Sequence, residues 1–174
     1  MRKDEVSGFT LLELLISFSI IATLSTVTIV AYVKYSRTQS VELAARTIAD
    51  VLQRAKSRTQ SQLVLNASGT NICGANPFTG YRVRFVRPSD GGAINTFELS
   101  VTCNGAAQPY NYSGRLPASV VFDETSPNPT VAFVTFLPIA GVIESPSIPA
   151  TVKINGNGIT RTVKVSKEGN ISIN

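Results

Sequence analysis

The sequence contains no histidine and no tryptophan, and its only methionine is the first residue. Without histidine the chain can form neither a Ser-His-Asp nor a Cys-His nucleophile system, and it can hold no histidine-ligated metal. A glycine-rich phosphate loop is also missing, because Gly91-Gly92 and Gly156-Asn157-Gly158 lie between short extended runs and are typical of turns. We therefore expect no enzymatic activity, no cofactor and no metal site.

Proline and glycine are missing from every position between Phe9 and Ser68. These are the two residues that most readily end or break a helix. One uninterrupted helix from about Phe9 to about Gln62 is therefore expected, and at 1.5 Å per residue it would be roughly 80 Å long.

The first half of this helix has almost no charge. Between Phe9 and Val33, a run of 25 residues, Glu13 is the only charged side chain. Such a helix measures roughly 37 Å, which is enough to cross a bilayer with some tilt. The run is too long for a secretory signal peptide, and a plain membrane anchor would not explain the acid. We predict a leader at 1–8 and a membrane-spanning helix at 9–33.

The segment Gly8-Phe9-Thr10-Leu11-Leu12-Glu13 resembles the start of type IV prepilins and type II secretion pseudopilins. This resemblance implies that a prepilin peptidase cleaves between Gly8 and Phe9 and methylates the new amino group of Phe9. It also implies that the apolar helix becomes the core of a filament, and that the protein has the α+β pilin fold.

A single acid in an apolar segment is costly, so by default it has a functional reason. By resemblance to the family, Glu13 would meet the N-terminal amine of a neighbouring subunit and set the register of assembly. A simpler alternative is that Glu13 stabilises the N-terminus of its own helix, where acids are favourable. The two roles are compatible.

The second half of the helix, with the residues that follow it, forms an amphipathic stem over 34–65. One face of the stem is apolar at three- and four-residue intervals. Another face alternates acids and bases four residues apart, which stabilises a solvated helix. The apolar set is Val41, Ala44, Ala45, Ile48, Leu52 and Ala55, and the charged set is Glu42, Arg46, Asp50, Arg54 and Arg58.

The remaining residues, 66–174, are expected to form a β-rich head. Short β-prone runs alternate with turns, and Asn155-Gly156-Asn157-Gly158 predicts a hairpin. We predict an α+β fold in which the long helix packs on an antiparallel sheet of six or seven strands. The predicted strands are Tyr81–Val86, Thr96–Thr102, Ser119–Phe122, Val131–Leu137, Ala150–Asn155, Thr160–Ser166 and Asn170–Ile173.

Three later segments resemble motifs of GspH/FimT-type minor pilins and pseudopilins. They are the stem end Leu52–Ser57, the segment Thr135-Phe136-Leu137-Pro138 with Gly141, and the final run Arg161–Val165 with Gly169–Ile171. A major pilin remains an alternative. Major pilins usually have a proline midway along the anchor, which is absent here, so a minor subunit is favoured.

Cys73 and Cys103 both lie in the predicted head. An even cysteine count in an oxidising compartment favours a disulfide, which would close a loop of about 30 residues and stabilise by roughly 3 kcal/mol. Two buried thiols or a metal site are the alternatives. The pair alone, without histidine, is a poor zinc site.

The net charge of +5 raises the question of nucleic-acid binding. Lys34–Arg58 has six basic and two acidic residues, whereas Thr59–Asn174 has eight basic and six acidic. Anionic lipid or filament neighbours suffice to explain a basic stem. In the head, Arg82, Arg84 and Arg87 are the candidate nucleic-acid contacts, and a solvated strand face is the favoured interpretation. In FimT-type DNA receptors a Gly-Arg-x-Arg motif binds DNA, but Gly169-Asn170-Ile171-Ser172 lacks both arginines.

Taken together, these features predict a structural minor pilin or pseudopilin in the inner membrane, with its head in the periplasm or exterior. Its expected partners are the prepilin peptidase and other pilin or pseudopilin subunits, and nucleic acid is not favoured. A type IV pilus and a type II secretion pseudopilus both remain open. The alternative from another class is a membrane-anchored binding module that never polymerises.

Overall fold

The computed structural model describes residues 10–62, 71–87, 90, 95–125, 130–138 and 142–174, and the side chains of 26–28, 30 and 109–111 fall outside that description. Two compact units meet between Arg37 and Thr38. The first unit is helical where it is described, and the second contains the rest of the helix and all the strands.

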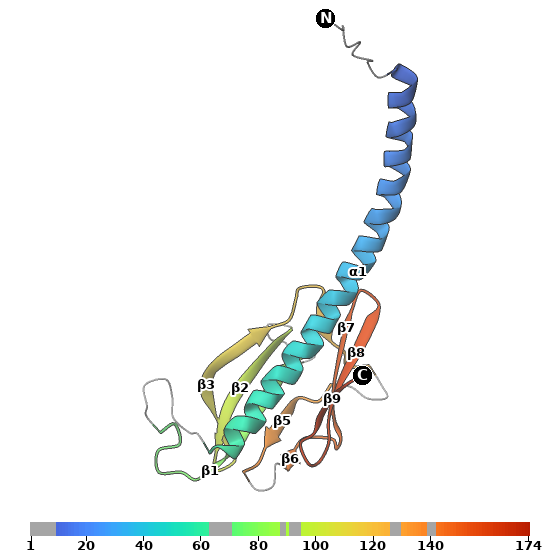
Figure 1. Ribbon diagram of the computed structural model, residues 1–174. Helices are drawn as coiled ribbons and strands as arrows, with labels where there is room; N and C mark the ends of the chain where they lie inside the picture. The colour runs from blue at the N-terminus through green and yellow to red at the C-terminus, as the bar shows by residue number, and fades with distance from the viewer. Residues whose placement is uncertain (1–9, 63–70, 88–89, 91–94, 126–129, 139–141) are drawn as a thin grey trace, which may run out of the picture. The chain divides into compact units, whose positions relative to one another are not determined.

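A single helix, α1, covers Leu11–Gln60 (Figure 1). It ends two residues before the predicted end, and the predicted start at Phe9 lies outside the described residues. The sequence predicts a membrane-spanning segment over 9–33. Within the part of the chain that the structure describes, no helix is both long enough and apolar enough to span a membrane.

Among the residues that the structure describes, nine strands follow the helix and form two antiparallel sheets. The first sheet has the order β3-β2-β1-β5-β6. Its strands are β1 (Phe78–Val86), β2 (Thr96–Cys103), β3 (Ala106–Arg115), β5 (Phe133–Phe136) and β6 (Ile143–Glu144). The second sheet has the order β4-β7-β8-β9. Its strands are β4 (Val120–Phe122), β7 (Ala150–Gly156), β8 (Ile159–Val165) and β9 (Ile171–Ile173).

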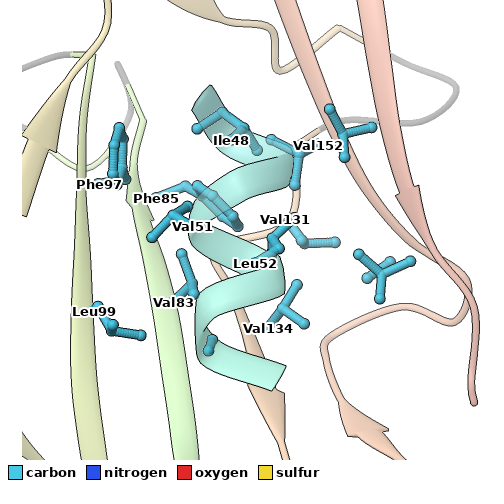
Figure 2. Packing of buried hydrophobic residues seen from close by; sticks show 14 of the residues in the cluster. Ile48, Val51, Leu52, Val83, Phe85, Phe97, Leu99, Val131, Val134 and Val152 are labelled. Carbon is cyan, nitrogen blue, oxygen red and sulfur yellow. The ribbon is translucent and has the colours of Figure 1, made fainter. Parts of the chain in front are cut away.

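The apolar stripe of the stem is the centre of the core. All six predicted stripe residues are buried, and Val51 is buried with them. In Figure 2, Ile48, Val51 and Leu52 project from the helix among side chains of both sheets. Val83 of β1 with Phe97 and Leu99 of β2 lie on one side, and Val134 of β5 and Val152 of β7 lie on the other. The helix therefore packs against both sheets in one core, where the sequence predicts a single sheet.

Direct contacts between the described parts of the two sheets include a backbone hydrogen bond and an aromatic pair. The backbone N–H of Val131, just before β5, donates to the carbonyl oxygen of Thr151 in β7 at 2.9 Å. The rings of Phe85 in β1 and Phe122 in β4 lie 5.5 Å apart between centroids. The head is consequently one packed body with a shared core.

Two strands are missing from the sequence prediction. β6 has only two residues. β3 contains Pro109 and Gly114, which disfavour strands, yet it pairs with β2 at the edge of the first sheet. The register of its pairing with β2 shifts between Leu99 and Ser100. Leu99 pairs with Tyr112, whereas Ser100 pairs with Pro109. Two residues of β3 are thus looped out of the ladder, and Pro109 sits on an edge strand where its missing N–H is tolerated.

The predicted hairpin is present. Asn157 and Gly158 connect β7 to β8 and both have positive φ, at 54° and 78°. A two-residue turn of this kind requires positive φ at both positions, which asparagine and glycine accept. Gly156 and Ile159 pair on either side of it, which fixes the register of the hairpin.

Candidate functional site

The first unit presents an apolar helix surface with nothing packed on it among the described residues. Large apolar side chains are exposed at consecutive positions rather than along one stripe, so they surround the helix. They include Leu11, Leu12, Leu14, Leu15, Ile16, Phe18, Ile20, Ile21, Leu24 and Ile29. An apolar surface of this extent marks a site of contact with protein or lipid.

Glu13 lies in the first turn of this apolar helix. Its backbone N–H donates to the carbonyl oxygen of Thr10 at 3.1 Å and to the Thr10 hydroxyl at 3.3 Å, so Thr10 caps the helix. The Glu13 carboxylate is exposed and has no hydrogen-bond partner among the described residues. The geometry fits an acid that is available to a group outside this part of the chain.

In the second unit, ionic contacts attach the stem to the second sheet. Arg161 of β8 donates from Nε to Oε2 of Glu42 at 3.2 Å, and Arg46 donates to Oε1 of the same carboxylate at 3.2 Å. Hydrogen bonds from Arg161 and then Arg46 hold the pKa of Glu42 below its usual value. The alternating charges predicted for the stem are also paired along the helix, as Glu42–Arg46 and Asp50–Arg54.

The three segments that resemble GspH/FimT motifs meet near the end of the helix. Lys56 donates from Nζ to the carbonyl oxygen of Gly169 at 2.9 Å. The Thr59 hydroxyl, three residues further along the helix, lies 3.4 Å from the carbonyl oxygen of Phe136. Residues more than 70 positions apart in the chain therefore interact, which gives these motifs a structural role.

Arg82 and Arg84 project from β1 on the face opposite the core, as the alternation with buried Tyr81, Val83 and Phe85 predicts. The guanidinium of Arg82 lies 4.5 Å from the centroid of the Phe133 ring and donates to the Thr135 hydroxyl at 2.9 Å. Both arginines line an open groove of about 450 Å³.

Arg87 does not share this groove. It pairs with Asp90 at 3.0 Å and with Glu124 at 3.5 Å, and it lines a separate depression beside Pro146–Pro149. The hydrogen bond to Asp90 raises the pKa of Arg87 and lowers that of Asp90. The three arginines predicted as one basic patch are therefore divided, and the charge of Arg87 is compensated locally.

The disulfide expected between Cys73 and Cys103 is present, with the two Cα atoms 5.5 Å apart. Both residues are buried in the core cluster. The bond ties the segment after the helix to the end of β2. Within the described segments of the chain, no three or more potential metal-ligating side chains form a group.

Comparison with known proteins matches both the start of the chain and its fold. Residues 5–29 match the prokaryotic N-terminal methylation motif. The structure is similar to a crystal structure of the type IV minor pilin FimU from Pseudomonas aeruginosa, with 19% identity, 80% of this chain and 92% of that chain covered, and a TM-score of 0.53. The chain carries a type IV pilin motif on a pilin fold. A second crystal form of FimU matches with 18% identity and a TM-score of 0.49. A search of curated proteins gives no significant match.

The pilin motif implies processing by a peptidase and assembly with other pilin subunits. The predicted processing residues Gly8 and Phe9 lie outside the described residues. Of the residues that line the groove, only the two arginines of β1 were predicted from the sequence as candidate contacts. Glu98, Ser100, Gln108 and Phe133 come from three other strands, and β3, which carries Gln108, was not predicted.

Proposed function

We propose that this protein is a minor pilin or pseudopilin, a structural subunit that a prepilin peptidase cleaves between Gly8 and Phe9. The processed subunit assembles through its N-terminal helix into a type IV pilus or a type II secretion pseudopilus. One observation carries the proposal: an apolar helix whose large side chains are exposed, with an acid in its first turn whose carboxylate has no hydrogen-bond partner in the described parts of the chain.

Under this proposal, two different environments cover the apolar surface of the N-terminal helix, one before assembly and one after it. Before assembly, the inner membrane covers the helix, and the head lies in the periplasm or exterior. After assembly, the helices of other subunits replace the lipid. Leaving so many large apolar side chains in water would be costly, since each buried side chain contributes about 1.5–3 kcal/mol.

The acid gives this assembly its register. Cleavage leaves a cationic amine on Phe9, and Glu13 is the only acid of the apolar run. In low dielectric an unpaired charge is expensive, and an opposite charge at close range offsets much of that cost. Pairing between the amine of one subunit and Glu13 of the next therefore favours a single axial offset.

A substitution at Glu13 tests the proposal directly. We expect Glu13→Ala to insert into the membrane at the normal level but to be lost from sheared filaments by at least tenfold. Asp50→Ala, which removes an exposed acid from the same helix outside the apolar run, should leave filament levels unchanged. Normal incorporation of Glu13→Ala would contradict the assigned role.

Mass spectrometry of the native N-terminus tests the processing step separately. A mature chain that begins with methylated Phe9 is expected. A chain that retains residues 1–8 would instead support an anchored module that never polymerises. Neighbouring genes would distinguish the two filament types, because a secretin-and-protease cluster indicates secretion and a retraction ATPase indicates a pilus.

A further inference from the structure

The outer face of the first sheet contains a groove that pilin assembly does not require. It is lined by Arg82 and Arg84 of β1, Glu98 and Ser100 of β2, Ala107 and Gln108 of β3, Ala132 just before β5, and Phe133 of β5. Its volume of about 450 Å³ is in the range of small-molecule sites. Four segments of the head thus bring polar groups and one aromatic ring together.

Arg82 is fixed in the groove without an acid. Its side chain is half-buried against the ring of Phe133 and is held by the Thr135 hydroxyl, yet no carboxylate lies within ion-pair distance among the described residues. Arginine that loses water contact is normally paired with an anion. A pre-positioned guanidinium that lacks one is suited to bind a planar carboxylate with two parallel hydrogen bonds.

Arg84 lies two residues along the same strand face, about 7 Å away at the spacing of alternate strand residues. Glu98 is directly opposite it in the ladder, but the two side chains form no ion pair within 4.0 Å. Neither has a hydrogen-bond partner among the described residues. The side chains of Arg84, Glu98 and Gln108 therefore have hydrogen-bond donors and acceptors available to a ligand in the groove.

The charges in the groove select against polyanions. Its lining has two arginines and one glutamate, and Glu144 of β6 lies opposite Thr135 on the same face. Duplex DNA carries a charge every 1.7 Å and binds best where several cations follow one another. Here acids interrupt the arginines, and Arg87 is paired elsewhere. The groove therefore fits one carboxylate in a ligand that also offers hydroxyl groups to Glu98 and Gln108.

We propose that this groove binds an acidic sugar residue of a polysaccharide, with its carboxylate on the arginines and its ring hydroxyls on Glu98 and Gln108. Uronic acids have this combination of one negative charge and several hydroxyls. The open groove allows the residue to be part of a longer chain. The inference goes beyond filament assembly and does not rest on it, because it uses only head residues.

Titration of the full-length protein in detergent with tetragalacturonate tests the proposal. We expect saturable binding that Arg84→Gln weakens at least tenfold, since it removes an exposed guanidinium that lines the groove. Lys164→Gln removes an exposed cation from the second sheet and should leave affinity unchanged. Thermal unfolding of each variant verifies that the fold is retained.

Neutral maltotetraose, a tetraglutamate peptide and a single-stranded 12-nucleotide DNA separate the ligand classes. Weaker binding of all three supports an acidic sugar. Equal binding of maltotetraose would overturn the role of the carboxylate, and equal binding of the peptide would overturn the sugar. Tighter, steeply salt-dependent binding of DNA, or no saturable binding of tetragalacturonate, would also refute the proposal.

Discussion

Asp123 is a largely buried acid that three groups of the head hold in place. Its Oδ1 accepts hydrogen bonds from the backbone N–H and the hydroxyl of Thr125 at 2.8 and 2.7 Å. Its Oδ2 pairs with Lys153 of β7 at 3.1 Å. Burial by itself would raise the pKa of Asp123, but the hydrogen bonds from Thr125 and Lys153 outweigh it and lower the pKa. The acid is thus charged when folded, and it joins the end of β4 to β7.

The lowered pKa predicts how Asp123 contributes to stability across pH. The contribution is fully present above the unfolded-state pKa of about 3.9 and is lost as the pH falls through the lower folded-state value. We expect Asp123→Asn to reduce the free energy of unfolding at pH 7 by about 2 kcal/mol. The difference from wild type should shrink below about pH 4. Denaturant unfolding at several pH values measures both effects.

Asp50→Asn is a matched control for this experiment. Asp50 pairs with Arg54 on the stem, where both side chains are more than half exposed. An exposed pair of this kind contributes little, so the control should change stability by less than about 1 kcal/mol. An equal loss in both variants would argue against the Asp123 network.

Gly114 of β3 leaves the space that a neighbouring aromatic ring occupies. A Cβ at this position would overlap the ring of Phe97, which is buried beside it in β2. The ring therefore occupies the space that any other residue's side chain would need. This contact explains why a glycine interrupts a strand, and the sequence offers no signal for it because Phe97 is 17 positions away.

We expect Gly114→Ala to destabilise the head by about 1–3 kcal/mol, because the added methyl group must displace the Phe97 ring. Ser113→Ala, on the exposed neighbouring residue, should change stability by less than about 0.5 kcal/mol. Thermal unfolding of both variants measures the difference. A neutral Gly114→Ala variant would mean that the ring can repack at low cost.

At the scale of the elements, Leu52 and Leu43 of α1 lie in contrasting environments. Leu52 is fully buried between the sheets, whereas Leu43 is 60% exposed on the same helix. We expect Leu52→Ala to cost about 2–5 kcal/mol, from lost apolar burial and the cavity left behind. Leu43→Ala should cost less than about 1 kcal/mol, because alanine has high helix propensity and no cavity forms.

Denaturant unfolding of these two variants tests the position of the core. The same side chain is shortened in the same helix, so differences in helix propensity cancel. Similar losses at both positions would contradict the burial of the stem face. A larger loss for Leu43→Ala in assembled filaments than in the isolated protein would instead show that Leu43 contacts another subunit.

The elements were predictable to different degrees. The helix and the stripe around Ile48 follow from local spacing and from the absence of proline and glycine, so the sequence defines them well. Strands β1, β2, β7 and β8 also show recognisable β-prone runs. β3 is the clearest failure, because Pro109 and Gly114 normally argue against a strand. Its pairing with β2 depends on tertiary contacts that no local pattern encodes.

At the scale of the whole molecule, the chain has two units with opposite surface properties. The head buries its apolar side chains, whereas the helix before Arg37 exposes them. We expect a chain that begins at Thr38 to be a monomer in detergent-free buffer, because every residue of the core cluster is retained. The full-length chain should self-associate or require detergent.

Size-exclusion chromatography with light scattering distinguishes these outcomes. Circular dichroism of the shortened chain should retain the helix and strand content of the head. Aggregation of the shortened chain would show that the head needs the first unit to fold. A full-length chain that stays monomeric without detergent would contradict the prediction that detergent, lipid or other subunits must cover the apolar helix.

The candidate sites were also only partly predictable. Glu13 stands out in the sequence because it is the only charge in an apolar run. Arg82 and Arg84 follow from strand alternation. The sequence does not indicate that Arg87 lies outside their groove, because the carboxylates of Asp90 and Glu124 approach Arg87 only in the folded chain. The groove is likewise a product of sheet order, which places Gln108 and Phe133 on either side of β1 and β2.

The slip in β3 has a consequence for a molecule proposed to polymerise. A regular edge strand would present unpaired backbone N–H and C=O groups, and the heads of two molecules could then pair edge to edge. The two looped-out residues and the imino nitrogen of Pro109 interrupt that row of donors. We therefore expect that heads do not pair with one another along β3, which leaves the N-terminal helix as the surface through which subunits are proposed to add.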